Sequence, residues 1–73
     1  MNTYLLKEAT KLAMMTASTF DPKFEDTDAL TELIIEFYMD IETFAVQMLQ
    51  FTPDEIETMD DATAKKLVSK YID

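Results

Sequence analysis

The 73-residue chain contains no glycine, cysteine, histidine, arginine or tryptophan. Without cysteine and histidine it cannot form disulfides, the usual zinc sites or a histidine-activated nucleophile. Without glycine it cannot readily form tight type I′ or II′ hairpins or a glycine-rich phosphate loop. These absences favour helices joined by short polar turns, and we therefore expect an all-α fold.

Long hydrophobic runs are also missing. No apolar run approaches the roughly eighteen residues of a membrane-spanning helix. Lys7 and Glu8 interrupt the first apolar segment, so we expect no signal peptide. A chain this short forms one small domain, which buries only about 60% of the surface that its unfolded state exposes. We expect a single domain over residues 1–73, located in the cytoplasm and without contact to a membrane.

Apolar residues recur every three or four positions, which is typical of amphipathic helices. The spacing predicts helices over about residues 3–18, 27–51, 53–59 and 61–72. Asn2 or Thr3 can begin the first helix, and Thr52-Pro53-Asp54-Glu55 is a capping box with proline at the first helical position. We predict a small three- to four-helix bundle with a long central second helix. We favour two short helices at the end of the chain over one bent helix.

The second helix has an unusually wide apolar surface. When its residues are placed at 100° steps, the apolar arc covers roughly 240° of the circumference, which is more than an ordinary amphipathic helix has. The helix therefore needs partners on most of its sides. Its polar arc contains Glu32, Glu36, Asp40, Thr43, Gln47 and Gln50. In the turn before this helix, Phe20 and Phe24 are expected to pack onto the core.

Charge is distributed very unevenly along the chain. Thirteen of the fifteen carboxylates lie between Asp21 and Asp61, where Lys23 is the only basic residue, so that this segment sums to −12. The two flanking segments sum to +1 and +2, which gives the total of −9. Such a block repels nucleic acid and anionic lipid and attracts basic surfaces.

The residue types present disfavour catalysis, metal binding and direct nucleic-acid binding. Ser18 and Ser69 have no histidine to activate them, and a domain of this size rarely forms a cleft that desolvates one carboxylate of an acid–base pair. Residues 21–32 do not form an EF-hand loop, because Lys23 and Asp26 replace an oxygen ligand and the glycine. No arginine is available for contacts to bases or phosphates. We expect no enzyme activity, no cofactor and no metal site.

Surface carboxylates form the first candidate site. Acids four residues apart on a helix are separated by about 6 Å along its axis, which is of the order of the phosphate spacing on a nucleic-acid strand. We expect these acids to contact a basic surface of another protein; the alternative is a solvated face that maintains solubility. The candidates are Glu32, Glu36, Asp40, Asp54, Glu57, Asp60 and Asp61.

A second apolar stripe on the long helix forms the other candidate site. The neighbouring helices are shorter than the second helix, so part of this stripe should stay uncovered, and exposed apolar stripes usually mark interfaces. A twofold homodimer is the simplest closed arrangement, with Glu42 at the edge of the interface, paired with a lysine or pointing to water. The alternative is ordinary core. The candidates are Ile35, Met39, Val46 and Leu49.

The second half of the chain resembles a known group of proteins. Residues 45–72, with Phe51-Thr52-Pro53-Asp54-Glu55-Ile56-Glu57 and then Asp61-Ala62, are similar to the C-terminal parts of phage tail assembly chaperones, which are small, acidic and helical. The similarity covers under half of the chain. It implies a protein that holds an assembling partner with apolar helix faces. Small size, acidity and the lack of catalytic groups also look like phage-encoded inhibitors that mimic DNA.

Two functions are therefore expected. The first is a non-enzymatic acidic protein-binding module, of the type that a phage uses to occupy a basic, nucleic-acid-binding surface of a host nuclease or polymerase. The alternative is a phage tail assembly chaperone or another structural or adaptor protein that uses apolar helix faces. Salt separates the two, because electrostatic binding weakens steeply as salt rises and apolar binding does not.

Overall fold

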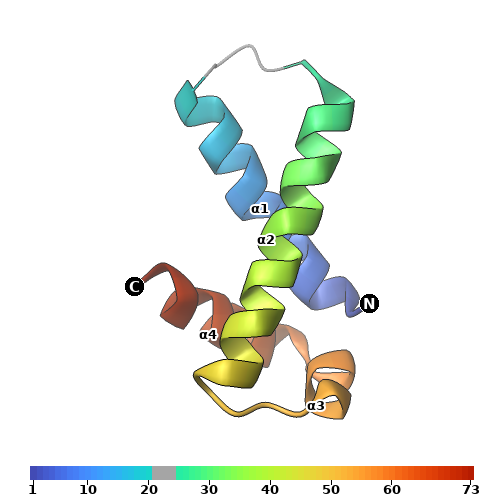
Figure 1. Cartoon of the computed structure of the whole chain (residues 1–73), viewed down its shortest axis with the longest axis vertical. Helices are drawn as coiled ribbons and strands as arrows, with labels where there is room; N and C mark the ends of the chain where they lie inside the picture. The colour runs from blue at the N-terminus through green and yellow to red at the C-terminus, as the bar shows by residue number, and fades with distance from the viewer. Residues whose placement is uncertain (21–24) are drawn as a thin grey trace.

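The computed structural model describes residues 1–20 and 25–73. These residues form four α-helices and no strand: α1 (Thr3–Phe20), α2 (Thr27–Gln47), α3 (Pro53–Thr58) and α4 (Asp61–Ile72). The prediction of an all-α fold is confirmed. Figure 1 shows α1 and α2 crossing along the long axis of the molecule, while α3 and α4 lie at its lower end. Within the described residues, no helix combines the length and hydropathy needed to cross a membrane.

Three helices begin at capping side chains, of which Thr52 is the one in the predicted capping box. The Asp26 carboxylate accepts a backbone N–H from the first turn of α2. Thr52 Oγ1 accepts the N–H of Glu55 at 3.2 Å, and Glu55 Oε1 accepts the N–H of Thr52 at 3.1 Å, which completes the capping box of α3. The Asp60 carboxylate accepts the Thr63 N–H at 2.9 Å. These separate caps make α3 and α4 two helices, as predicted.

The predicted end of the second helix is wrong. α2 stops at Gln47 rather than at Phe51, because the chain turns at Gln50, which has a φ of 59°. After the turn, the Phe51 N–H donates to Ala45 O at 2.9 Å. Phe51 remains partly buried against the core although it lies outside the helix. The apolar periodicity therefore continued past the end of the helix and extended the prediction too far.

The predicted role of Phe20 is also wrong. α1 continues to Phe20 instead of ending at Ser18, and the Phe20 side chain is 85% exposed. Figure 1 shows that the C-terminal end of α1 and the N-terminal end of α2 stand apart. The same expectation for Phe24 lies outside the described residues.

The core joins all four helices at the lower end of the molecule. The largest fully buried side chains are Leu5 of α1, Ile41 of α2 and Leu67 of α4. The aromatic rings of Phe44 and Tyr71 form an edge-to-face contact, with ring centroids 5.7 Å apart. Beyond Ala9 toward the upper end, α1 buries only the small side chains of Ala13 and Ala17.

Asn2 ties the start of α1 to two other parts of the fold. Its Oδ1 accepts two N–H groups from the first turn of α1, at 2.9 and 3.0 Å, so Asn2 rather than Thr3 is the cap. Its Nδ2 donates to the carbonyls of Glu57 and Met59, both at 3.0 Å. Its backbone N–H donates to the Tyr38 hydroxyl at 2.9 Å. One buried residue, through its side chain and its backbone N–H, therefore links α1, α2 and the C-terminal end of α3.

Candidate functional site

Three of the predicted acidic residues lie on one exposed ridge of α2. Glu32, Glu36 and Asp40 are four residues apart, so each side chain lies about one turn above the next. All three are exposed, and none forms an ion pair within the part of the chain that the structure describes. Burial raises the pKa of Tyr71, and the Asp40 carboxylate adds to this rise, which places Asp40 near the end of α4. We call Glu32, Glu36 and Asp40 the acidic ridge.

Three other predicted residues lie in the first turns or caps of α3 and α4. Asp54 is exposed in the first turn of α3, where a negative charge is favourable. Asp60 caps α4, and hydrogen bonds from Thr63 lower the pKa of its carboxyl. Asp61 pairs with Lys65, with 3.2 Å between Oδ2 and Nζ. Asp60 and Asp61 are therefore already engaged by their own helix, whereas the ridge carboxylates are not.

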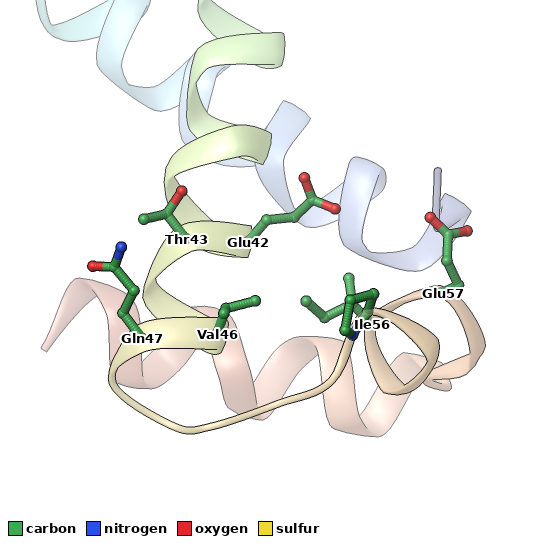
Figure 2. A pocket seen from close by; sticks show the side chains of 7 residues that line it. Glu42, Thr43, Val46, Gln47, Ile56 and Glu57 are labelled. Carbon is green, nitrogen blue, oxygen red and sulfur yellow. The ribbon is translucent and has the colours of Figure 1, made fainter.

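The seventh residue, Glu57, lies beside a pocket rather than on the ridge. Its Oε2 is 3.2 Å from the Met1 ammonium. The pocket has a volume of about 320 Å³ and lies between α2 and α3. Figure 2 shows Val46 and Ile56 directed toward each other across the pocket, while the carboxylates of Glu42 and Glu57 lie along one rim. The lining residues are Glu42, Thr43, Val46, Gln47, Pro53, Ile56 and Glu57. We call it the α2–α3 pocket.

The acidic rim of this pocket adjoins the hydrogen bonds of Asn2. Burial raises the pKa of the Tyr38 hydroxyl, and the negative charges of Glu42 and Glu57 raise it further. Both carboxylates are thus close enough to act on the hydroxyl that accepts the Asn2 N–H. Glu42 itself is half-buried, and it has no ion-pair partner among the described residues. The two carboxylates therefore give the rim of the pocket a negative potential.

The second apolar stripe is partly uncovered. Ile35, Met39 and Val46 are 44%, 59% and 44% exposed, respectively. Leu49 does not belong to the stripe, because it follows the end of α2 and packs partly buried against the core. The prediction was that some of the four candidate residues stay uncovered, and Leu49 is the covered one. Val46 belongs both to the stripe and to the α2–α3 pocket, so the two surfaces are continuous.

The sequence did not indicate the pocket itself. Pro53 and Ile56 form its α3 wall, but in the sequence they appear only as parts of a capping motif. The wall exists because the turn at Gln50 and the hydrogen bonds from Asn2 place α3 beside the C-terminal part of α2. The one sequence feature that could have indicated the pocket is Ile56. It is the only large apolar residue of the six-residue α3, and it is buried.

Neither the described carboxylates nor known proteins identify the site. Within residues 1–20 and 25–73, no group of three or more acidic side chains is arranged to hold a metal ion. Comparisons with models of protein families, with curated proteins and with solved structures found no match to this chain. A function must therefore be argued from the chemistry of the acidic ridge, the apolar stripe and the α2–α3 pocket.

Proposed function

We propose that this protein is a non-enzymatic binding module whose acidic ridge occupies a basic surface of another protein. The observation that carries the proposal is the set of three exposed carboxylates without ion pairs in the described structure. Like charges four residues apart destabilise a helix by about 0.2–0.5 kcal/mol per pair. A basic partner surface would relieve this repulsion. Within the described residues, all lysines lie on α1 or α4 rather than on α2.

The spacing of the ridge favours a partner that normally binds nucleic acid. Successive acids on α2 are separated by about 6 Å along the helix axis, so they can substitute for consecutive phosphates. Negative charge would steer the protein to the partner's basic groove and exclude the nucleic acid from it. A phage-type inhibitor of a host nuclease or polymerase, acting in the bacterial cytoplasm, would work in this way.

The experiment is capture of partners from a bacterial lysate by the immobilised protein at low and high salt. Capture should fall steeply between about 50 and about 500 mM salt, because screening shortens the range of electrostatic attraction. The variant Glu32→Lys/Glu36→Lys/Asp40→Lys should lose the partner and keep its helical circular dichroism. Duplex DNA added in excess should compete for the captured partner.

A matched variant separates the effect of the acidic ridge on partner capture from the effect of net charge. Glu25→Lys/Asp28→Lys/Asp73→Lys also replaces three exposed acids by lysines and gives the same net charge. It should retain the partner. Equal capture by the ridge variant and the unmodified protein would reject the proposal and leave the ridge as a solvated face.

The exposed stripe favours a second candidate function, which is apolar capture of an assembling partner or of a second copy of the chain. Ile35, Met39 and Val46 expose apolar surface beside the acidic ridge. In this case sedimentation should show a homodimer at high micromolar concentration, and Met39→Glu should convert it to a monomer without loss of helix. Met14→Glu, at an exposed methionine of α1, is the control. A monomer in the unmodified protein would reject the homodimer, and salt-resistant capture would favour a chaperone or adaptor.

A further inference from the structure

The α2–α3 pocket combines an apolar interior with an acidic rim. Val46 of α2 and Ile56 of α3 point into it from opposite sides (Figure 2). Its volume of about 320 Å³ lies at the lower end of the range for ligand sites, about 300–1,000 Å³. A pocket of this size and openness to the surface suits one long side chain better than a cofactor.

The acidic rim already holds one cation and has capacity for another. The Met1 ammonium lies 3.2 Å from Glu57 Oε2, yet the Glu57 side chain remains 52% exposed. Glu42, on the same rim, has no cationic partner among the described residues. The potential at this rim therefore favours a positive group.

A second hollow at the same end of the molecule has the opposite charge. It measures about 220 Å³ and is lined by apolar side chains together with Lys66 and Lys70. Leu67 lies in this second hollow and not in the α2–α3 pocket. The two hollows therefore offer a test of charge selectivity within one protein.

We propose that the α2–α3 pocket receives a lysine or arginine side chain of the partner protein, an inference that rests on the proposed function and names its most specific contact. The aliphatic stem of such a side chain packs on Val46 and Ile56, and its charged end reaches Glu42 and Glu57. Long basic side chains bury their stems on apolar surface while keeping the charge near polar groups. An uncharged side chain would leave the carboxylates without a partner, and an acidic one would be repelled.

The test uses N-acetyl-arginine methylamide as the probe and methyl NMR of the full chain as the measurement. Titration in the millimolar range should shift the methyl resonances of Val46 and Ile56 and leave those of Leu67 in place. N-acetyl-citrulline methylamide has nearly the same shape and no charge. Its affinity should be about tenfold lower, because hydrogen bonds to charged groups are the stronger ones.

Two pocket variants and one control on the acidic ridge locate the contact. Glu42→Gln should weaken arginine binding about tenfold, whereas Glu36→Gln, which removes the same charge from the acidic ridge, should change it less than about twofold. Val46→Phe fills the pocket from an exposed position and should abolish the shift of the Ile56 methyl. Circular dichroism should stay unchanged in all three variants. Equal binding of the arginine and citrulline probes, or equal effects of Glu42→Gln and Glu36→Gln, would overturn the inference.

The lysate experiment distinguishes this inference from the proposed function. If reversal of the acidic ridge abolishes partner capture while Glu42→Gln and Val46→Phe leave both capture and probe shifts unchanged, the proposed function stands and the pocket contact is rejected. If ridge reversal has no effect on capture, the proposed function is rejected independently of the probe result. Reduced capture in all of these variants, together with arginine-selective shifts, supports both.

Discussion

The lower and upper ends of the molecule are held together in different ways. The lower end, which we call the junction, joins α2 and the C-terminal end of α3 to the start of α1 through hydrogen bonds from Asn2 to residues 36, 55 and 57 positions away. In the upper end, which we call the arm, the described side-chain hydrogen bonds join residues of the same helix. Examples are the bonds from Ser18 to Met14 and from Thr31 to Thr27. Within the described residues, the arm therefore depends on apolar packing between its helices, whereas the junction adds polar contacts that specify one geometry.

The largest effect should follow from breaking the junction. Asn2→Ala removes a helix cap, which is worth about 0.5–2 kcal/mol, and leaves two carbonyls without donors at a cost of about 1–3 kcal/mol. We expect the free energy of unfolding to fall by about 3 kcal/mol in urea titrations followed by circular dichroism. Asn2→Asp should have an intermediate effect, because it retains the cap but cannot donate to Glu57 and Met59.

Thr3→Ala is the control for this prediction. Thr3 is the adjacent exposed residue, and its replacement should change stability by less than about 0.5 kcal/mol. If Asn2→Ala behaves like Thr3→Ala, the long-range hydrogen bonds do not hold the junction, and its difference from the arm disappears.

The stability of the protein should be next most sensitive to substitutions in the arm, because they disturb apolar packing rather than hydrogen bonds. Ala13 of α1 is fully buried, and α1 packs more extensively against α2 than against any other helix. Ala13→Leu inserts a large side chain, and overpacking typically costs about 1–3 kcal/mol; we expect about 2 kcal/mol from urea unfolding. The methyl resonances of Ile56, in the junction, should stay in place. Met14→Leu, at the adjacent exposed position, should be close to neutral, and a neutral Ala13→Leu would show that the helices of the arm are not closely packed.

The same contrast explains what the sequence revealed and what it did not. Local features were predictable, because the Thr52 cap and the exposure of the acidic ridge depend only on residues within one or two turns. The long-range role of Asn2 was not predictable, because its carbonyl partners lie more than fifty positions away. The α2–α3 pocket was missed for the same reason, since it exists only after α3 has docked against α2.

A smaller effect should come from the hydroxyl of Tyr38, which accepts the Asn2 N–H within the junction. Tyr38→Phe leaves this buried donor without an acceptor and should cost about 1 kcal/mol near neutral pH. Burial raises the pKa of Tyr38 above its ordinary value of 10.0. The folded state therefore favours the neutral hydroxyl. The stabilisation that this hydroxyl contributes is fully present below the pKa that Tyr38 has in the unfolded chain, and it is lost as pH rises through the pKa that Tyr38 has in the folded protein.

The measurement is the difference in unfolding free energy between the unmodified protein and Tyr38→Phe from about pH 7 to about pH 11.5. The difference should shrink above about pH 10, while the titration of the lysines and the other tyrosines, which both proteins contain, largely cancels. A difference that stays constant across this range would mean that Tyr38 is as accessible to water in the folded state as in the unfolded chain.

The smallest effect, and the only stabilising one, should come from the turn that leads into the junction. Gln50 has a φ of 59° in a chain without glycine. A left-handed conformation costs a non-glycine residue about 1–2 kcal/mol, and glycine would relieve this cost while losing about 0.5–1 kcal/mol through its greater freedom in the unfolded chain. Gln50→Gly should therefore raise the free energy of unfolding by about 0.5 kcal/mol. Gln47→Gly, the same change at the last residue of α2, should lower it by up to about 1 kcal/mol. If both changes destabilise the protein alike, position 50 is helical, and α2 extends to Phe51 as the apolar periodicity of the sequence predicts.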